Sequence, residues 1–468
     1  MLFDDLLEPF LSKRPVAVMA RACFEHAFAA ADIDALFHRV VINQYELQLT
    51  FSSLVELLGA VVTRRYSSVH AAYRADPAKL AASLSSVYDK LNHTEPAVPE
   101  ALVAHTARRL GAVFDEWPGR EQPFEGFRLK VVDGNYLAGT DHRLKVMRGH
   151  GAAALPGMAI VVQDYGTGLV TDLIAAEDAY VNERALADRL LERVSAGEVI
   201  VADRNFCMRG LFEGIAERRA CFVIRHHEGS ALEPAGELVH AGPSPTGEVF
   251  EPAVMVGGAA YRLILVRRTT PTTNGDTAIR LLTNLPRDRF PAVAVAESYR
   301  LRWTIEATFL EVTRSVQCEL NTLGYPKAAL LTFALALCAN NAVRVVLRAL
   351  ELAQGPAHPG EGVSGYYVVN EVIAAHDGMA VALPESIWTI LRAWTVKQFA
   401  GWLLTIARTA DWSKYRKTTR GPKKPVSKTK GARGAPHRST FRQLMENSKP
   451  ASTNRPPSKK PKPATLPP

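Results

Sequence analysis

The stretch that decides the fold is Tyr299 to Arg314, which reads YRLRWTIEATFLEVTR. On a helix with about 3.6 residues per turn, Tyr299, Arg302, Glu306 and Thr313 follow one another at steps of three, four and seven positions. Their side chains therefore fall along one side of the helix. We expect this side to form a polar wall.

The other side of the same stretch is apolar, with Ile305, Phe309 and Val312 at helical spacing. This pattern predicts a helix that packs one face against a sheet. A carboxylate and a guanidinium one turn apart suit a site that holds a divalent metal beside a phosphate, because such cations prefer carboxylate oxygens and the arginine fork grips phosphate oxygens. An ordinary i, i+4 ion pair on a solvated face would give the same pattern, so the helix alone leaves both interpretations open.

The spacing of Tyr, two residues, Arg, three residues and Glu resembles the signature helix of the DDE transposases of bacterial insertion sequences, specifically the insertion-sequence-four family. That family's motif ends in a Lys seven positions after the Glu, where this chain has Thr313 followed by Arg314. The resemblance implies an α/β fold with a ribonuclease-H-like catalytic core, interrupted by a β-strand insertion and flanked by helical domains. It also implies two upstream aspartates, each ending a buried strand.

Two runs of sequence fit these implied aspartates. Residues 127–135, FRLKVVDGN, alternate and then turn apolar, which predicts a strand that ends at Asp133 before a glycine turn. Residues 198–202, EVIVA, predict a short buried strand that runs into Asp203, and the Asp-Arg that follows resembles the family's second motif. Three other aspartates compete for the first position and are less well placed, namely Asp141, Asp164 and Asp172.

The remaining pattern alternates strands and helices. We expect strands at 158–163 and 169–175, joined by a tight turn at 164–166, then helices at 182–194 and 208–218 and a strand at 221–226. An insertion at about 228–280 reads as β-rich, with strands at 248–256 and 261–268 separated by Gly257-Gly258, and a further strand follows at 279–284.

The flanks of residues 126–330, the expected catalytic domain, have helical periodicity. Residues 1–125 read as a helical domain with basic and aromatic side chains interleaved at Arg64, Arg65 and Tyr66. A plain helical bundle would look the same, whereas the resemblance implies that this region binds the DNA of the element ends. Residues 331–412 read as a second helical subdomain that covers the sheet.

The basic charge of the chain is concentrated in residues 413–468. The formal net charge is +9, yet this segment alone holds 16 of the 56 Lys and Arg residues and one of the 47 Asp and Glu residues. With ten prolines and few large apolar residues, the segment is expected to be a disordered tail. It would bind nucleic acid non-specifically or keep the protein soluble, and we favour the first role.

Export and membrane insertion are not expected. The five cysteines are scattered without a C-x-x-C pair, and the first ten residues, MLFDDLLEPF, have acids where a signal peptide has basic residues. The longest apolar run, residues 328–343, is shorter than the roughly 20 residues of a membrane span and reads as a core helix. These features fit a cytoplasmic protein associated with the nucleoid, and no small-molecule substrate is indicated.

The resemblance assigns roles to the selected residues. Asp133, Asp203 and Glu306 would hold two Mg²⁺ ions, with Mn²⁺ as a possible substitute, and catalyse cleavage at the element end and direct attack of the new 3′-hydroxyl on target DNA. The three residues Tyr299, Arg302 and Arg314 would contact DNA, with Arg314 in place of the absent Lys. The partner would be double-stranded DNA bound by a homodimer. A ribonuclease-H-like nuclease without strand transfer, or a DNA-binding relative without catalysis, stays open as an alternative.

Overall fold

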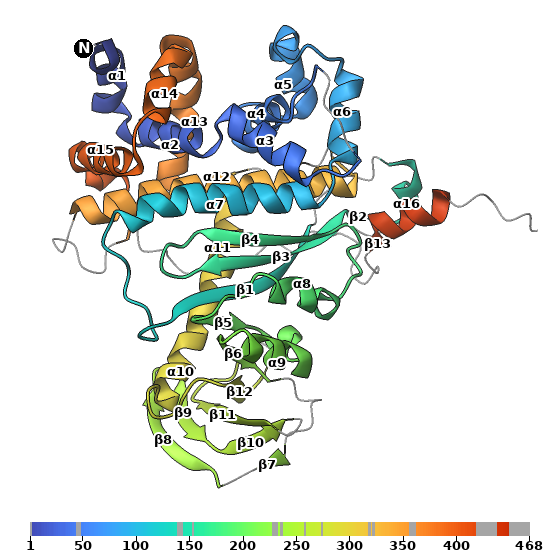
Figure 1. Ribbon diagram of the computed structural model, residues 1–468, viewed down its shortest axis with the longest axis vertical. Helices are drawn as coiled ribbons and strands as arrows, with labels where there is room; N and C mark the ends of the chain where they lie inside the picture. The colour runs from blue at the N-terminus through green and yellow to red at the C-terminus, as the bar shows by residue number, and fades with distance from the viewer. Residues whose placement is uncertain are drawn as a thin grey trace, which may run out of the picture.

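The computed structural model describes residues 2–43, 48–137, 144–151, 154–226, 233–234, 237–256, 259–272, 275–316, 320, 323–354, 362–417 and 438–448. Helices fill one end of the molecule, one large sheet occupies the middle, and the strands of the insertion lie at the far end (Figure 1). The expected α/β class is confirmed.

Seven helices precede the sheet in the described residues. They are α1 (Leu2–Lys13), α2 (Pro15–Ala27), α3 (Ala30–Val40), α4 (Phe51–Val62), α5 (Val69–Ala75), α6 (Leu84–His93) and α7 (Ala97–Asp115), with the 3₁₀ turn η1 (Pro77–Leu80). Thr50, Ser68 and Ser83 cap α4, α5 and α6, each accepting a backbone N–H with its side-chain oxygen. The predicted helical character of the first 125 residues is therefore confirmed.

Four helices follow the sheet in the sequence and share a core with the first group. They are α12 (Pro326–Gln354), α13 (Gly365–Ala382), α14 (Glu385–Arg392) and α15 (Val396–Thr409). All four pack against α2, and buried side chains of both groups form one cluster around Val16, Met19, Val346 and Phe399. The two helical flanks that the sequence separates are thus one helical layer, which lies against one edge of the sheet through α7 and α12 (Figure 1).

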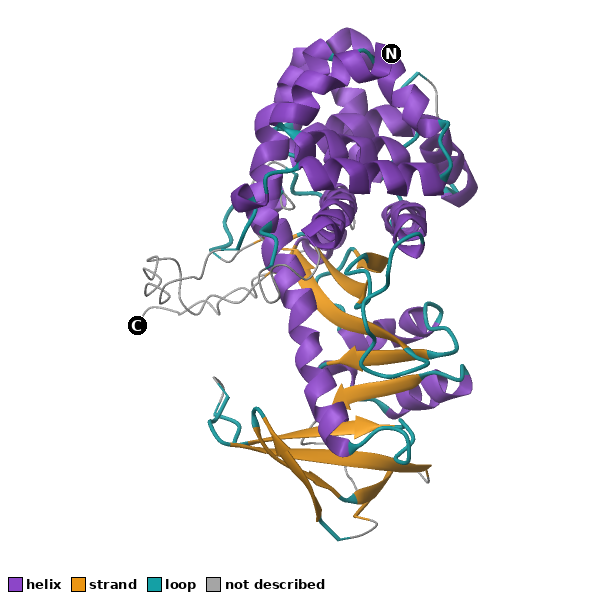
Figure 2. Cartoon of the chain, turned by 90° about the vertical axis from the view of Figure 1, so that its left-hand side faces the viewer, coloured by secondary structure: helices purple, strands orange, loops and turns teal. Residues whose placement is uncertain are grey.

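The described strands form one sheet of 11 strands beside a two-stranded pair. Its first part is the antiparallel meander β1 (Arg128–Leu137), β3 (Gly157–Asp164) and β4 (Val170–Ala176), and β5 (Glu198–Ala202) and β6 (Cys221–Arg225) then add in parallel, giving the order β4-β3-β1-β5-β6. The predicted meander is confirmed. Helices α8 (Ala187–Leu191) and α9 (Arg209–Glu217) lie on the face opposite the α10–α11 segment described below (Figure 2).

The insertion extends this sheet because β12 pairs antiparallel with β6. Its strands are β7 (Glu233–Pro234), β8 (Val239–Ser244), β9 (Gly247–Glu251), β10 (Ala253–Val256), β11 (Ala259–Arg268) and β12 (Ala278–Thr283). The single strand predicted at 248–256 is wrong, since it divides at Pro252, which has no N–H to donate. Gly257-Gly258 lies outside the described residues, but β10 and β11 pair antiparallel on either side of it.

Two helix predictions need correction. The helix expected at 182–194 is a 3₁₀ turn, η3 (Glu183–Leu186), followed by the short α8, although the predicted Asn182 cap is present. The signature stretch is not one helix, because α10 (Ala292–Tyr299) and α11 (Trp303–Ser315) are joined by the 3₁₀ turn η5 (Arg300–Arg302). The backbone stays right-handed throughout, so Tyr299, Arg302 and Glu306 keep nearly the predicted alignment.

The expectation of a disordered tail is wrong for two parts of residues 413–468. Tyr415 is 2% exposed and donates its hydroxyl proton to Glu371 at 2.6 Å. Farther along, β13 (Arg438–Ser439) pairs with β2 (Ala154–Leu155) and continues into α16 (Thr440–Ser448), where Arg442 binds Asp178 at 2.6 Å. The composition of the whole tail hid this short amphipathic segment. Residues 418–437 and 449–468 lie outside the described part.

Helix α12 is the centre of the helical layer. It is long and apolar enough to cross a membrane by length and composition, but 94% of its most apolar window is buried inside the protein. Asn341 is 0% exposed, and its amide accepts from the Val170 N–H at 2.8 Å and donates to the Val170 carbonyl at 2.9 Å. Asn341 thus pairs with both backbone polar groups of Val170 on the edge strand β4 and links α12 to the sheet.

We expect Asn341→Ala to lower the free energy of unfolding by about 2–4 kcal/mol, because it leaves the buried N–H and C=O of Val170 without partners. Chemical denaturation would measure the change. The neighbouring Asn340 is a matched control, since its buried amide nitrogen has no partner among the described residues and Asn340→Ala should cost less. Equal losses of unfolding free energy in the two variants would contradict the proposed role of Asn341 in linking α12 to β4.

Candidate active site

The register of the sheet brings the two predicted aspartates together. Strands β1 and β5 run parallel and their last pair is Val132 with Ala202, so Asp133 and Asp203 are the next residues on adjacent strands. Neighbouring strands lie about 4.8 Å apart. Asp203 leaves β5 there, and its side chain caps the 3₁₀ turn η4 (Arg204–Phe206) by accepting the Asn205 N–H at 2.8 Å.

The prediction that Asp133 ends its strand is wrong. Strand β1 continues through Gly134 to Leu137 because β3 stays paired with it along that length. What ends at Asp133 is the pairing with β5, since β5 stops at Ala202. Asp133 therefore lies where β1 loses one neighbour, a position that leaves its side chain room to meet α11.

Arg302 joins Asp133 to the signature helix. Its Nη1 lies 3.0 Å from Oδ2 of Asp133 and its Nη2 lies 2.5 Å from Oε1 of Glu306. The side chains of Arg302 and Asp133 are 12% and 15% exposed, whereas that of Glu306 is 36% exposed and so is more open to solvent. The structure thus brings Asp133, Arg302 and Glu306 into direct contact, with Asp203 on the adjacent strand.

Buried contacts fix α11 in this position. Ile305 and Val312 are 0% and 1% exposed, as the helical pattern predicts. Thr308 is also fully buried, and its hydroxyl accepts a hydrogen bond from the Gln163 amide of β3 at 2.8 Å. On the next turn Glu311 binds Arg344 of α12 at 2.7 Å. The helix that carries Glu306 is therefore tied to the sheet and to the helical layer.

Burial dominates the electrostatics of Asp133. Burial raises the pKa of this carboxyl, Arg302 opposes that shift and the negative charges of Asp203 and Glu306 add to it, so that in total the pKa rises from 3.8 to about 7. The carboxylates of Asp203 and Glu306 are thus near enough to Asp133 to influence its pKa. One guanidinium does not compensate all of them.

Tyr299 lies beside the same arginine. Its side chain is 9% exposed, and burial raises the pKa of its phenol to about 12, with Arg302 and Arg225 opposing the shift. The phenol is hydrogen bonded to Arg302. The Nε of Arg302 is buried and has no hydrogen-bond partner among the described residues, which leaves one donor for a ligand.

A fourth acid, Glu183, was missed by the sequence analysis. It is 7% exposed, and a Cβ at Gly134 would lie 2.0 Å from its Oε1, so Gly134 lets this side chain lie directly against β1 next to Asp133. Burial raises the pKa of Glu183 and the charge of Asp203 raises it too, while a hydrogen bond with the Asn205 side chain lowers it. The signal for this contact in the sequence was the Asp133-Gly134 pair, which was interpreted as a turn. In the structure the glycine makes room for the Glu183 carboxylate.

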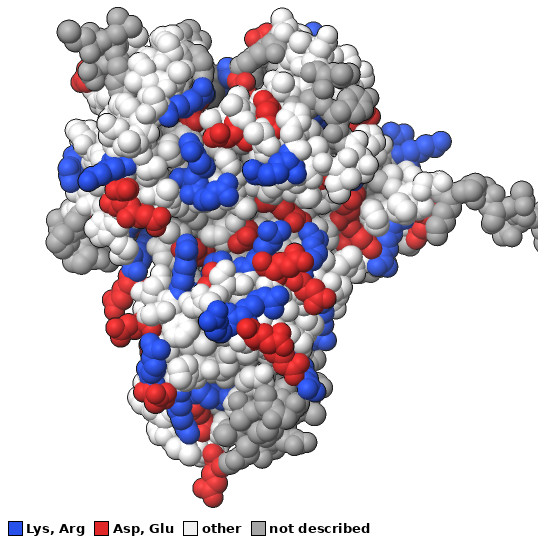
Figure 3. All heavy atoms as spheres, in the orientation of Figure 1, with Lys and Arg blue, Asp and Glu red and all other residues white. Residues whose placement is uncertain are grey.

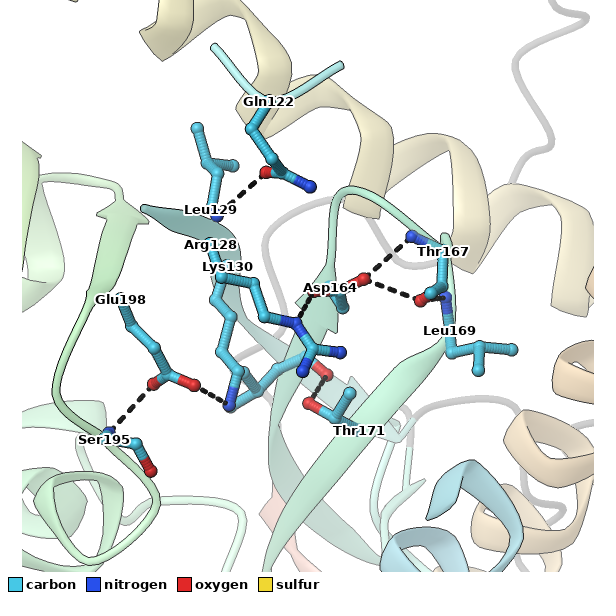
Figure 4. A network of polar contacts seen from close by, with 11 residues as sticks. Gln122, Arg128, Leu129, Lys130, Asp164, Thr167, Leu169, Thr171, Ser195 and Glu198 are labelled. Carbon is cyan, nitrogen blue, oxygen red and sulfur yellow. Dashed lines mark hydrogen bonds and ion pairs between the residues drawn. The ribbon is translucent and has the colours of Figure 1, made fainter. Parts of the chain in front are cut away.

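Two of the competing aspartates, Asp164 and Asp172, take no part in the cluster. Asp164 accepts from the Thr167 N–H and hydroxyl at 2.7 Å each and pairs with Arg128, in a network at the start of β1 that also contains the Lys130–Glu198 pair (Figure 4). Asp172 lies on β4, which β3 separates from β1. Asp141 and the side chain of Arg314 lie outside the described part of the structure.

The carboxylates have the chemistry of a Mg²⁺ site but not its arrangement. Oxygen ligands of this kind suit hard divalent cations. Among the described residues, however, no group of three Asp, Glu, His or Cys side chains is placed so that it could hold one ion. The guanidinium of Arg302 lies between two of the expected ligands, Asp133 and Glu306.

We expect the stability of metal-free protein to fall as pH rises from about 4 to 7. Folding raises the pKa of Asp133 to about 7, so the folded state keeps a proton that the unfolded chain has released, and the stabilisation is lost through that window. Each unit of pKa difference corresponds to about 1.4 kcal/mol. Unfolding in EDTA would show a steeper decline for wild type than for Asp133→Asn, and parallel curves would contradict the shift.

Arg302→Gln should lower the free energy of unfolding of metal-free protein by about 3 kcal/mol, because it leaves buried acids without their cation. The loss should be greater at pH 8 than at pH 6, where Asp133 can take up a proton. Arg300, two residues earlier and exposed, gives the matched control Arg300→Gln. A loss of stability that does not depend on pH, or the same loss in the control, would contradict a stabilising role for the contacts of Arg302 with Asp133 and Glu306.

Comparisons with known proteins match the region that contains these residues. The family described as "Transposase DDE domain" matches residues 128–341, a span that contains Asp133, Asp203 and Glu306. A relative from Sinorhizobium fredii named "Putative transposase y4zB" is 31% identical over 142 residues, which cover 29% of this chain and 38% of that protein. The chain thus spans less than half of the length of this relative. Together the matches support a DDE transposase domain within residues 128–341 of this chain.

Proposed function

We propose that the protein is a transposase of the insertion-sequence-four type, which binds the terminal inverted repeats of its element, cuts DNA at the ends and joins each 3′-hydroxyl to target DNA. The observation that carries the proposal is the meeting of Asp133 and Asp203, from adjacent strands, with Glu306 from α11. All three lie within the match to the transposase domain.

The proposed core is ribonuclease-H-like. Its support is the strand order β4-β3-β1-β5-β6, an antiparallel meander followed by two parallel strands, with α11 across the face that Figure 2 shows. The β-rich insertion falls between β6 and α10 and widens the same sheet through β12. This arrangement delivers both aspartates to one point on the sheet and Glu306 above it.

Asp133, Asp203 and Glu306 are the residues that would hold Mg²⁺ or Mn²⁺. Such ions lower the pKa of an attacking water or hydroxyl and stabilise the leaving oxygen. In the geometry described, Arg302 separates Asp133 from Glu306, so these residues do not present a ready-made metal group. The excess negative charge at Asp133 nevertheless favours added cations.

The proposed DNA contacts surround this cluster. Arg302 has an unused buried Nε donor that suits a phosphate oxygen, and Tyr299 lies against it. Arg314, whose side chain lies outside the described part, stays a candidate for the absent signature Lys. On the face in Figure 3, Lys and Arg side chains are interspersed with Asp and Glu. We infer that the helical layer and the basic tail supply further contacts, and that a homodimer holds two ends.

The decisive experiment uses DNA that carries the flanking inverted repeats, with Mg²⁺, and compares wild type with Glu306→Gln. We expect the substitution to abolish cleavage and joining, by a factor of at least about 10³, while DNA binding persists. Glu297→Gln is the matched control, because Glu297 is exposed on α10 and belongs to no part of the cluster.

The products separate the alternatives. If a pre-cut end is hydrolysed further but never joined to target DNA, the protein is a nuclease without strand transfer. If wild type binds the ends and neither cuts nor joins them, it is a DNA-binding relative and the proposed chemistry is wrong. Equal activity in Glu306→Gln would refute the assignment of Glu306.

A further inference from the structure

The loop between α4 and α5 touches the catalytic helix. We call residues 63–68 the α4–α5 loop, which reads TRRYSS. The Nη2 of Arg64 in this loop donates to the main-chain carbonyl of Thr313 at 3.5 Å, across 249 positions of sequence. A basic side chain of the helical layer therefore reaches the last turn of α11, which ends at Ser315.

The α4–α5 loop forms a hollow of about 700 Å³, lined by Arg64, Arg65, Tyr66, Ser67 and Ala71. Arg64 and Arg65 are exposed, and the Arg65 guanidinium lies 5.1 Å from the centre of the Tyr66 ring. Two guanidinium groups, a hydroxyl and an aromatic ring are the donors and the stacking surface with which proteins bind a nucleic-acid backbone. The lining thus suits a polyanion better than an apolar ligand.

The backbone of the α4–α5 loop is held in place. Arg64 has a φ of 63°, in the left-handed region that non-glycine residues seldom occupy. The N–H groups of Arg64 and Arg65 donate to carbonyls of the last turn of α4, at 2.9 Å each. This is the geometry of a helix C-terminal cap, in which a residue just past the helix takes the left-handed conformation, so the cap of α4 fixes the direction in which the loop leaves the helix.

Capping of α11 does not account for this arrangement. The Thr313 carbonyl is among the last four of the helix, which lack intrahelical partners, so a nearby arginine can cap it. The distance of 3.5 Å makes this a weak hydrogen bond, and it uses one of the five guanidinium donors. The cap also leaves the hollow and the second arginine unexplained.

The position of Arg64 relative to Glu306 fits a nucleic-acid strand. Thr313 follows Glu306 by seven residues, which is about 10 Å along a helix that rises about 1.5 Å per residue. Successive phosphates on one strand of a duplex advance by about 3.4 Å along its axis. Because the strand also winds around that axis, neighbouring phosphates are farther apart than this rise, and a phosphate near Arg64 would be about one to two nucleotides from one at Glu306.

We propose that the α4–α5 loop is a binding site for the phosphodiester backbone of the DNA strand that is cut, about one to two nucleotides from the scissile phosphate. Arg64 and Arg65 supply the positive charge at the end of α11, where position 313 is a threonine. The inference rests on the proposed function and identifies a contact made by the helical layer to the same strand.

The first test measures binding of duplex DNA that carries the inverted repeat, by fluorescence anisotropy at several salt concentrations. Because each phosphate contact contributes about 0.9 to the slope of log K against log salt, Arg64→Ala and Arg65→Ala should each lower the slope by about 1. Arg408→Ala is the control, since Arg408 is exposed on α15 at the other end of the helical layer (Figure 1). Thermal unfolding would verify that all variants remain folded.

The second test locates the contact. Single uncharged methylphosphonate linkages are placed at successive positions on either side of the cut. Wild type should lose affinity at a linkage about one to three nucleotides away, the spacing that a separation of about 10 Å allows along a winding strand. Arg64→Ala should be insensitive to that same linkage, whereas Arg408→Ala should behave as wild type.

The outcomes separate this inference from the proposed function. If wild type binds and cuts the ends but Arg64→Ala and Arg65→Ala keep its salt slope and its linkage sensitivity, the loop site is wrong and the transposase activity stands. If wild type binds DNA without cutting it, the proposed function is wrong, while the salt slopes still decide the role of the loop. A wild type that binds no DNA would overturn both.

Discussion

The site depends on one guanidinium held between two acids. Arg302 binds Asp133 and Glu306 at once, yet burial and the neighbouring acids still raise the pKa of Asp133 to about 7. A single positive charge is therefore too little for this cluster. An anionic phosphate would make the imbalance worse unless cations enter with it. The same shortage of positive charge that destabilises the free protein would favour the binding of divalent ions in the complex with DNA.

The fold keeps these charges together against their repulsion. Register between β1 and β5 fixes the aspartates, and the Gln163–Thr308 hydrogen bond fixes α11 above them. Gly134 lets Glu183 approach so closely that a side chain at 134 would collide with it. Acid groups that would separate in water are thus held by strand pairing and packing, which cost nothing at the moment a ligand binds.

Periodicity and one motif predicted much of this site, and local geometry decided the rest. The apolar stripe of α11 and the buried run of β5 identified Glu306 and Asp203, because both follow regular patterns. The strand at Asp133 was predicted to end in a glycine turn. Instead, Gly134 lies within the strand and leaves space for the Glu183 side chain, a contact that the spacing of residues in the sequence cannot reveal. The bridge by Arg302 likewise depends on tertiary distance. The average composition of residues 413–468 also failed to reveal α16, because a helix of nine residues hardly changes the average composition of so basic a segment.

The charge at a site depends on which side chains the fold brings together, and these can come from distant positions in the sequence. Thr313 lies where a basic residue would extend the polar wall of α11, and its hydroxyl instead donates to the Phe309 carbonyl at 2.8 Å. The guanidinium of Arg64, which belongs to a loop of the helical layer, contacts the same turn of α11. A guanidinium from a separate element places its charge on the end of α11 without adding a side chain to that helix. Under the proposed loop site, the helical layer and the sheet would both contact one strand of DNA, so the contact between them would serve recognition as well as folding.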